Sequence, residues 1–552
     1  MKRIILTLII LVNFILVAQS EYVPVTNRVY EFLERMESLH LLDSYNSFEV
    51  PKDRKEIASY INQVIQHNLK LDPVDKEILE DLKSEFEYEL YGTLNNAQSI
   101  ISGEDYNPFN QKEHYLFSHS EKNKFNLFIN LIGEAEGIFL NGKEPEKNLS
   151  SSTWLYGGEI RGTVLDKLGF YIKGTNGIVA GNLEAALLKR ELKSNFKLNL
   201  APDEKFFDET EGYISADFDL VKLKFGRQKF DVGYGPFKMI SGANSPAFDY
   251  LSFKIGYSFF NFSYYHSKIG GKSTVVDDSI QGSVSNVAEK YFGYHRIGFD
   301  ISRHFKLGIG EMIIYGDRPM DFSYVNPFNF YKTVEHSNQD RDNAMLFADM
   351  SNNSIEGLKL YATLLIDDLN AGKIGTGWWG NQTMISAGLN SYNLYPVAPV
   401  DLSLQYIRIE PYTFTHRLIK NNFTNMGYSL GPDIEPNSEL FFCQINYRFN
   451  HRLNLSASLA LINHGANPVD ENGVVIKNVG GTINLGHRLQ DAAEVEFLDG
   501  AQEVLRTYSF RLSYEPFNQL FVSISAFYRN HSLQKSITQK QLESFVSVST
   551  KF

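Results

Sequence analysis

The sequence contains a single cysteine, Cys443, among 552 residues. It therefore cannot form a disulfide framework within the chain or a zinc cluster built on cysteines. Long hydrophobic runs are also scarce. Only residues 4–18 form one, whereas a polytopic helical membrane protein needs about 20 apolar residues for each span. Proline is limited to 17 residues and no low-complexity tract occurs, which argues against extended disorder.

Basic residues are in the minority. Lys and Arg number 53 against 65 Asp and Glu, which gives a formal net charge of −12. Nucleic-acid binding usually requires a basic face, so no nucleic-acid partner is expected. Aromatic residues, in contrast, are abundant, with 41 Phe, 31 Tyr and 3 Trp. Together with a mean hydropathy of −0.25, this composition favours many β-strands.

Recognisable catalytic motifs are absent. The chain contains no HExxH, no GxSxG and no phosphate-binding P-loop. A triad of Ser, His and Asp cannot be seen from spacing alone in a strand-rich chain, so an enzyme remains as the least favoured alternative. We therefore expect a protein without enzymatic activity, and we expect no cofactor and no metal site.

Residues 1–20 have the three parts of a secretory signal peptide. A basic start (MKR) precedes the apolar run 4–18, and the small residues of AQS form a cleavage site. An uncleaved membrane anchor is the alternative, but the run is short for a span. We therefore predict that the mature protein begins near Glu21, outside the cytoplasm.

Residues 21–92 are predicted to form a small helical bundle. Apolar residues recur at i, i+3, i+4 and i+7 over residues 29–39, which places them on one helix face. Similar stripes follow Asp53 and Asp72, two residues suited to cap a helix. Such short helices are not stable alone, so they should pack together or dock on another part of the chain. The polar residues 93–121 are predicted to be a linker.

From about residue 122 onward, the apolar period changes from 3.6 to 2. Apolar and polar residues alternate, for example, over 453–461 and 507–514, as in strands with one apolar face. A soluble sandwich would show the same alternation, but short turns that alternate with long loops favour a membrane barrel. The long loops are predicted at 176–211, 267–290, 317–342, 410–437 and 465–502.

Two further features support the barrel. Tyr514 and Tyr528 lie near strand ends, where an interfacial aromatic girdle would need them. The final residue, Phe552, resembles the signal read by the outer-membrane barrel-assembly machinery. We predict a transmembrane antiparallel β-barrel of about 18 strands over residues 122–552, in the outer membrane of a Gram-negative bacterium, with both chain ends in the periplasm. Its lumen is too wide for side chains alone to fill, so it is plugged or it conducts.

Several short motifs bring charged residues onto or beside strands in the middle of the barrel. One interpretation is an internal salt-bridged network that braces the lumen wall. The other is a polar lining for a carbohydrate or a conducted solute. On the lipid face, Arg or Lys would cost about 2–4 kcal/mol at the midplane. The candidates for this lumen network are Arg227, Arg296, Glu311, Asp367 and Asp368.

Two of the three Trp residues, Trp378 and Trp379, lie in the predicted loop 369–382. Trp is unusual on a long loop, outside any core. It could anchor the loop in the outer leaflet, or it could stack on sugar rings, as aromatic faces do. Cys443 shares its strand face with Ile445 and is expected to face lipid.

Several stretches of the chain together carry a family resemblance. Two lie near the start, VPVTNRVYEFLERMESLHLLDS (23–44) and PKDRKEIASYI (51–61). The motifs RQKFDVGYGP, YHRIGFD, IIYGDRP, YVNPFNFY and LLIDD follow in that order. In these stretches the chain resembles the Wzi-type capsule assembly family of Gram-negative outer membranes, with the first two similar to the family's N-terminal helical segment. The resemblance implies an eighteen-stranded barrel, an associated helical bundle and binding of capsular polysaccharide. It transfers fold better than function, and no sugar-binding residue of the family can be assigned here.

The expected function is therefore to bind and retain exported capsular polysaccharide at the cell surface. A porin or solute-specific channel is the alternative, because both need a polar lumen and long loops. Besides the polysaccharide, the expected partners are outer-membrane lipid and, during biogenesis, the barrel-assembly machinery. The candidate ligand-binding residues are Tyr324, Asn326, Trp378 and Trp379.

Overall fold

The computed structural model describes most of the chain from residue 21 onward, and the predicted signal peptide lies outside the described residues. Side chains are described in the same ranges except over 272–286 and at 537. The described ranges are 21–101, 106–121, 124–143, 146–195, 198, 205–242, 245–278, 282–394, 399–533 and 537–552.

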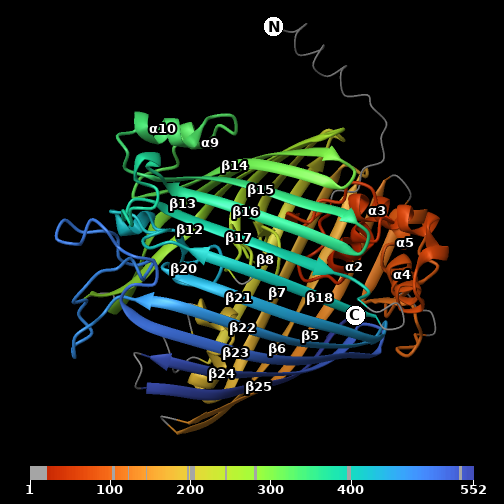
Figure 1. Cartoon of the computed structure of the whole chain (residues 1–552). Coiled ribbons are helices and arrows are strands. Elements are labelled where there is room, and N and C mark those ends of the chain that lie inside the picture. The colour runs from red at the N-terminus through yellow and green to blue at the C-terminus, as the bar shows by residue number, and fades with distance from the viewer. Residues whose placement is uncertain are drawn as a thin grey trace, which may run out of the picture.

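Eighteen long antiparallel strands close into a barrel, which dominates the molecule (Figure 1). Its strands are β5 (Phe125–Lys143), β6 (Lys147–Val164), β7 (Leu168–Gly181), β8 (Phe206–Asp217), β9 (Val221–Gln228), β11 (Phe248–Tyr257), β12 (Phe260–Asp278), β13 (Gly282–Ser302), β14 (Phe305–Gly316), β15 (Asn343–Ile355), β16 (Leu358–Asp368), β17 (Gln382–Ser391), β18 (Val400–Ile409), β21 (Ser438–Asn450), β22 (Leu453–Ala466), β23 (Ala501–Phe517), β24 (Leu520–Leu533) and β25 (Ile537–Lys551). The predicted fold class is confirmed.

The barrel closes where the last strand meets the first. β25 pairs with β5 from Lys540↔Lys143 to Lys551↔Ile132. Phe552 and Leu131 then exchange backbone hydrogen bonds of 2.7 and 3.0 Å. Below this point the short strand β4 (Phe117–Glu121) takes over the same edge of β5. Among the described residues, backbone pairing along β5 is thus continuous across the seam, as a membrane barrel requires.

Alternation along each strand separates two faces of the barrel. On β7, Tyr171 and Val179 point inward and are buried, whereas Leu168 and Ile172 point outward and are exposed. Cys443 lies on the outward face of β21, next to the exposed Ile445. Rows of exposed apolar side chains on the outer face are what a lipid-facing barrel requires.

Connections at the two ends of the barrel differ in length. At one end, which we call the turn end, most strands are joined by two or three residues, such as 303–304 and 518–519. At the opposite, loop end, 317–342 and 410–437 separate strands as predicted. The other three predicted loops are shorter, because β7, β8, β12, β13, β22 and β23 extend into them. Over 267–290 the two strands pair through to Asp278↔Gly282.

The N-terminal domain contains the helices α2 (Val29–Ser38), α3 (Arg54–Gln66), α4 (Pro73–Glu85) and α5 (Glu87–Tyr91). Asp53 and Asp72 cap α3 and α4 by accepting backbone hydrogen bonds, and Gly92 ends α5 with a φ of +70°. The apolar stripes of the helices meet in one core, which includes Val29, Phe32, Leu33, Met36, Ile57, Ile61, Leu79, Leu82 and Phe86.

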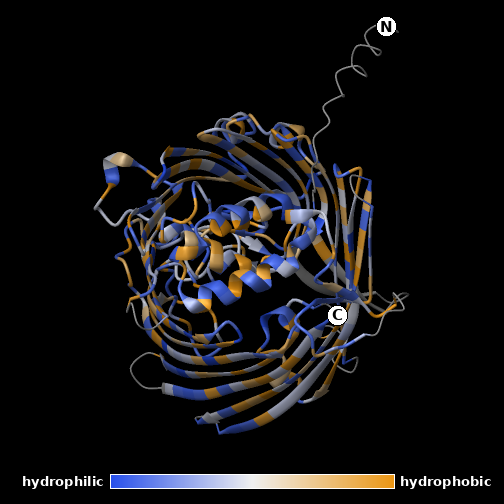
Figure 2. Cartoon of the chain, turned by 90° about the vertical axis from the view of Figure 1, so that its right-hand side faces the viewer, coloured by the Kyte–Doolittle hydropathy of each residue, from blue (hydrophilic) through white to orange (hydrophobic). Residues whose placement is uncertain are grey.

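This helical domain sits in the mouth of the barrel at the turn end, near the end of the last strand (Figures 1 and 2). Its strand β1 (Glu49–Val50) pairs with β10 (Asp231–Val232), a strand that lies between β9 and β11 in the sequence. Phe48 reaches farther and packs within an apolar core of the lumen. The domain is therefore a plug rather than a separate appendage.

The predicted linker carries secondary structure of its own. Within residues 93–121, β2 (Ala97–Ser99) pairs in parallel with β3 (Glu113–Tyr115), and β4 joins the barrel. At the loop end, short helices occur in the connections, including α6 (Leu183–Ala186), α7 (Arg190–Lys193), α9 (Phe322–Val325) and α10 (Tyr331–Ser337). In the part of the chain that the structure describes, no helix has the length and apolar character needed to cross a membrane.

Candidate functional site

The helical domain is held in the turn end by ion pairs that are almost fully buried. Glu37 of α2 lies between Lys306 of β14 and Lys359 of β16, and none of the three side chains is more than 4% exposed. One Glu37 oxygen lies 3.0 Å from the Nζ of Lys359. Burial alone would raise the pKa of Glu37, but the charges of Lys359 and Lys306 outweigh it and hold the pKa below its usual value. The carboxylate is therefore ionised at neutral pH.

A second buried cluster joins α2 and α4 to the wall strands β18 and β21. An Arg35 nitrogen lies 2.8 Å from Asp401, and another lies 3.4 Å from Asp75. Asp75 in turn lies 2.6 Å from Arg448. Two carboxylates and two guanidinium groups balance in charge here, and buried ions are tolerated when they are paired in this way.

Farther along the domain, carboxylates again meet cations of the wall. Glu49 accepts a hydrogen bond of 2.7 Å from the hydroxyl of Tyr294 and lies 3.5 Å from Lys254. Asp53, the cap of α3, forms an ion pair with Lys222 of β9. Complementary charge, as well as apolar contact, therefore fits the plug to the wall.

Sequence analysis did not identify these docking contacts. The sequence carries no clear signal for them, because Arg35 and Glu37 each lie about 100° round the helix from Met36, where solvent-exposed charges are equally common. The partners themselves, such as Lys306, lie hundreds of residues away and could not be paired by spacing.

Two segments from the loop end also enter the lumen. Segment 229–247 contributes β10, and segment 410–437 contributes Phe414 and Phe423, whose rings stack 4.8 Å apart. These side chains form one apolar core with Phe48 and with inward-facing residues of the wall. One side of the lumen is thus filled from both ends.

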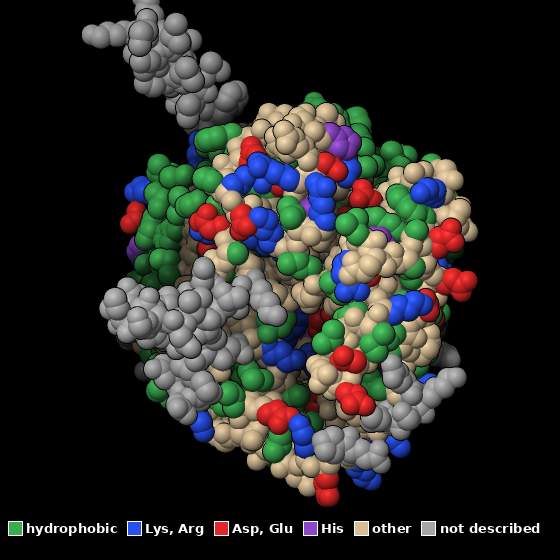
Figure 3. Space-filling model, turned by 90° about the vertical axis from the view of Figure 1, so that its left-hand side faces the viewer, with side chains coloured by type: hydrophobic (Ala, Val, Ile, Leu, Met, Phe, Trp, Pro, Cys, Tyr) green, Lys and Arg blue, Asp and Glu red, His purple; other side chains and the backbone are tan. Residues whose placement is uncertain are grey.

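The inner wall of β5 and β8 carries a separate network of charges. Lys189, between α6 and α7, lies 3.0 Å from Glu134 and 2.6 Å from Glu136, both on β5. Glu209 of β8 lies 2.7 Å from Lys229. These five side chains are between 12% and 32% exposed, so water reaches them. Seen from the loop end, charges of both signs are spread over a face that is hollowed near its middle (Figure 3).

Two of the five predicted lumen residues face the lumen. Arg296 of β13 is buried and forms two hydrogen bonds of 2.8 Å with Asp349, while its guanidinium group lies 4.4 Å from the Phe48 ring centre. Asp367 of β16 accepts a 2.7 Å hydrogen bond from the backbone N–H of Phe414. Both residues therefore hold the contents of the lumen against the wall.

The structure places the other three, Arg227, Glu311 and Asp368, on the outer face. Arg227 is ion-paired with a residue of the neighbouring strand. Glu311 and Asp368 contact segment 317–342, which folds back over the outside of the barrel. Alternation is the physical reason, because adjacent residues such as Asp367 and Asp368 must point to opposite faces of a strand. This corrects the lumen prediction for these three residues.

The candidate ligand residues fall in two different places. Tyr324 is fully buried within segment 317–342, where its hydroxyl donates a 2.8 Å hydrogen bond to Asp342 and its ring lies 5.0 Å from that of Tyr315. Asn326 is exposed and accepts a 3.2 Å hydrogen bond from the backbone N–H of Phe328. Tyr324 is thus part of the small core of its loop, and Asn326 stabilises a turn.

Trp378 and Trp379 lie where loop 369–381 meets loop 467–500. Trp379 stacks on His487 with ring centres 4.0 Å apart, so that ring face is covered. Trp378 is half-buried, and the Nζ of Lys373 lies 4.3 Å from its ring centre. Both Trp side chains are half-buried, and Trp379 connects the two loops.

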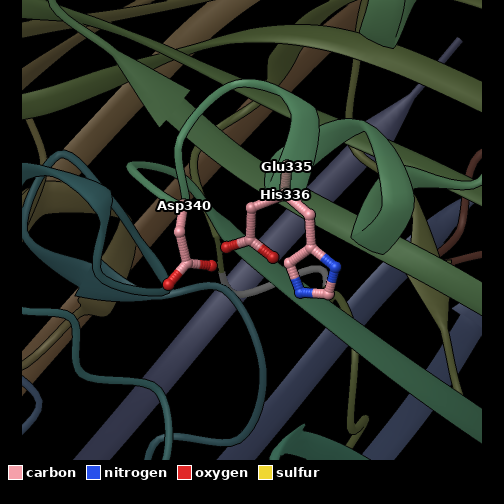
Figure 4. Close-up of side chains that lie close together, drawn as sticks. All are labelled: Glu335, His336 and Asp340. Carbon is pink, nitrogen blue, oxygen red and sulfur yellow. The ribbon is translucent and has the colours of Figure 1, made fainter.

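One group of side chains has the spacing of metal ligands. Glu335, His336 and Asp340 of segment 317–342 each offer one atom, and these atoms lie within 4.8 Å of one another (Figure 4). However, the Nζ of Lys332 lies 2.9 Å from Glu335 and already balances the only buried carboxylate of the group. Burial raises the pKa of Glu335 to about 7, in spite of Lys332, which further disfavours a cation site.

A closed barrel of this size, with a lipid-facing exterior, short turns at one end and long loops at the other, defines a bacterial outer-membrane protein. The family model for the capsule assembly protein Wzi matches residues 152–525, which is more than half of the chain. The chain therefore belongs to the Wzi family of capsule assembly proteins, as its motifs indicate. The turn end accordingly faces the periplasm, and the loop end faces the outside.

The solved structure of a Wzi protein supports the fold. Wzi of Escherichia coli, an outer-membrane protein involved in group 1 capsule assembly and described as a carbohydrate-binding β-barrel, is 11% identical. It covers 97% of this chain and 100% of its own length, with a TM-score of 0.58. OccK8 (OprE) of Pseudomonas aeruginosa, also 11% identical, covers 77% of this chain and 98% of its own, with a TM-score of 0.44. No curated protein sequence matches the chain.

Proposed function

We propose that this protein binds exported capsular polysaccharide and holds it at the outer face of the outer membrane, without catalysing a reaction. The observation that carries the proposal is that the periplasmic mouth is closed while part of the inner wall below the outer loops stays hydrated. The helical domain fills the periplasmic mouth through buried ion pairs such as Glu37–Lys359 at 3.0 Å. The charged inner wall of β5 and β8 stays hydrated beneath the outer loops. Membership of a family whose Escherichia coli relative is described as carbohydrate-binding supports the same function.

Sugar hydroxyl groups would find suitable partners on this side of the protein. Carboxylates such as Glu134 and Glu209 accept hydrogen bonds, and Lys189 donates them. Replacing a water molecule by a sugar hydroxyl at a hydrated polar group costs little free energy, because the hydrogen bonds that are exchanged are similar in strength. We place Trp378 at the outer rim as a surface on which a sugar ring stacks. Asn326 is a second exposed candidate, on a separate part of the loop face.

Retention of a polymer does not require one strong site. Each sugar unit would make a few weak contacts, but a long chain presents the same unit many times. Linked binding events raise apparent affinity by roughly 10²–10⁴ when the geometry permits them. A shallow, hydrated site would therefore be sufficient to keep the polymer attached when many copies of the protein bind one chain.

A porin or solute-specific channel is the second candidate. The hydrated charges near Lys189 favour it, because they could line a path for polar solutes. The helical domain and the segments 229–247 and 410–437 oppose it, because they occupy the lumen from both ends. A pathway for solutes would have to pass beside them.

Two further partners belong to the proposal. The exposed apolar rows, for example Leu168 and Ile172, are expected to contact outer-membrane lipid. Phe552 pairs with Leu131 where the barrel closes. This position is the one expected of a residue that the barrel-assembly machinery recognises. Neither partner involves covalent chemistry, and no enzyme activity is proposed.

The decisive experiment compares cell-bound with released polysaccharide in strains with and without the protein. We expect more released polymer in the deletion strain. Trp378→Ala should raise release while the barrel still folds. Trp154→Ala is the matched control, because Trp154 lies on β6 and points outward from the barrel. Equal retention with and without the protein would contradict the proposal and favour the porin, whereas an effect of Trp154→Ala alone would contradict the site.

A further inference from the structure

Segment 317–342 folds back over the outside of the barrel and does not project away from it (Figure 1). The outward residues Tyr291, Ile313 and Tyr315 are buried beneath it by Tyr324 and Tyr331. Glu311, also outward, accepts a 2.8 Å hydrogen bond from the backbone N–H of Tyr331. The hydroxyl of Tyr264 donates a 2.7 Å hydrogen bond to the carbonyl of Val325. The segment therefore has a fixed position on the outer wall.

A cavity of about 350 Å³ lies between this segment and the wall. Its wall side is formed by outward aliphatic residues of β13 to β16, and its other side by the turn between α9 and α10. At its polar end, His295 lies 3.0 Å from Glu311. The lining includes Ile297, Ile309, Leu346, Leu364, Phe328 and Phe330.

The cavity is continuous with the lipid-facing surface. Ile309, Leu346 and Leu364 are 56%, 42% and 39% exposed and belong to the apolar rows that contact the membrane. On the other side, Phe328 and Phe330 are 67% and 72% exposed on a loop at the outer end of the barrel. Exposed aromatic residues at that height suit the membrane interface rather than water. The opening of the cavity therefore faces hydrocarbon.

We propose that this cavity binds one acyl chain of an outer-leaflet lipid, with the lipid's polar end near His295 and Lys332. The apolar lining excludes a sugar as occupant, because sugar hydroxyls would lose water without gaining partners. Hydrocarbon fills the space without that loss. Lys332 donates its backbone N–H to Glu311 of the lining at 3.5 Å. Its ammonium group is 2.9 Å from Glu335 and 3.3 Å from Asp368, and at 30% exposure it still has room for the polar end of a lipid. This inference does not depend on polysaccharide binding.

The test uses the full-length protein incorporated into vesicles of phosphatidylethanolamine and phosphatidylglycerol, extracted in detergent and measured by native mass spectrometry. A parallel arm contains lipopolysaccharide instead, and identifies which lipid is retained. We expect one lipid to remain bound after the surrounding lipids are removed. Leu364→Trp, which fills the cavity, should reduce the lipid-bound fraction several-fold.

Leu459→Trp is the matched control, because Leu459 is 39% exposed on β22 and has the same relation to the membrane. It should retain lipid as the unchanged protein does. Phe328→Ala, which removes one side of the cavity without touching the barrel, should also release the lipid. Absence of retained lipid in both arms, or equal retention in Leu364→Trp and Leu459→Trp, would overturn the proposal. If Leu364→Trp abolished a dimer and left the bound lipid unchanged, the cavity would belong to an interface with a second copy of the chain. That result would also overturn the proposal.

Discussion

Glu37 is the residue on which the fit of plug and barrel most clearly depends. It is 1% exposed and lies between two ammonium groups, from Lys306 and Lys359. Removing one member of a buried ionic cluster leaves the others without compensation, which costs far more than the cluster contributes as a whole. The Glu37 carboxylate is therefore needed to balance the buried positive charges of Lys306 and Lys359.

Replacing Glu37 with Gln is expected to lower the stability of the docked domain by about 3–5 kcal/mol, because two buried cations lose their counter-charge. Limited proteolysis from the periplasmic side should then cleave the helical domain faster, while the barrel remains intact. Glu80→Gln is the control, because Glu80 is 60% exposed and pairs with Lys83 of the same helix. Equal protease resistance in both variants would show that the Glu37 cluster does not hold the plug.

The same carboxylate predicts how docking responds to pH. Since the pKa of Glu37 is lowered in the folded protein, its contribution is fully present above the unfolded value of about 4.3. It is lost as pH falls through the lower folded pKa. Protease access to the helical domain should therefore increase in acid, and this step should be smaller in Glu37→Gln. Docking that loosens instead as pH rises from neutral would contradict this assignment.

Among the elements, the existence of the strands was predicted better than the residues at which they begin and end. Period-two alternation identifies a strand where one face meets lipid, but the signal disappears where both faces meet water. The segment 267–290, with Gly270, Gly271 and many polar residues, therefore indicated a loop, although its backbone pairs as strand. The same limit applies to side-chain direction. Alternation counted from Lys306, which faces inward, would have placed Glu311 outside.

The packing of side chains within the loops was the least predictable part of the candidate site. Tyr324 is a residue type that commonly contacts sugars. In the structure, however, its ring is packed beneath α10 against Tyr315. Sequence spacing cannot reveal such packing, because it depends on how the loop folds back on the wall. Trp379 likewise stacks on His487, more than 100 residues away.

Tyr324→Phe tests this structural role. The change removes a hydrogen bond to the Asp342 carboxylate, which is worth about 1.5–3 kcal/mol when one partner is charged. We expect faster proteolysis within segment 317–342 and unchanged polysaccharide retention. Loss of retention with an unchanged loop would instead return Tyr324 to the ligand-binding residues.

For the whole molecule, the two parts of the chain differ in charge where they meet. Residues 21–92 contain 16 acidic and 8 basic residues, a net charge of −8. The wall opposite them offers mainly cations, including Lys222, Lys306 and Lys359. The chain as a whole is therefore acidic, although the inner wall of the barrel is basic at the periplasmic mouth.

This charge division leads to a prediction about the open pore. A variant that lacks residues 21–92 should insert as a barrel and conduct more than the full-length protein in planar bilayers, because the periplasmic plug is gone. Its mouth would expose Lys222, Lys306 and Lys359 to water, and like charges focused in a channel attract counter-ions.

The current through this variant should therefore prefer anions, measured as the reversal potential in a salt gradient, and the preference should weaken at high salt as charges are screened. The heat-dependent gel mobility of a folded barrel is the control for correct insertion. A folded variant that conducts no better than the full-length protein would show that segments 229–247 and 410–437 suffice to close the lumen, and a preference for cations would contradict the basic wall. In the full-length protein, the acidic domain neutralises these lysines, so that one interface both closes the barrel and cancels its selectivity.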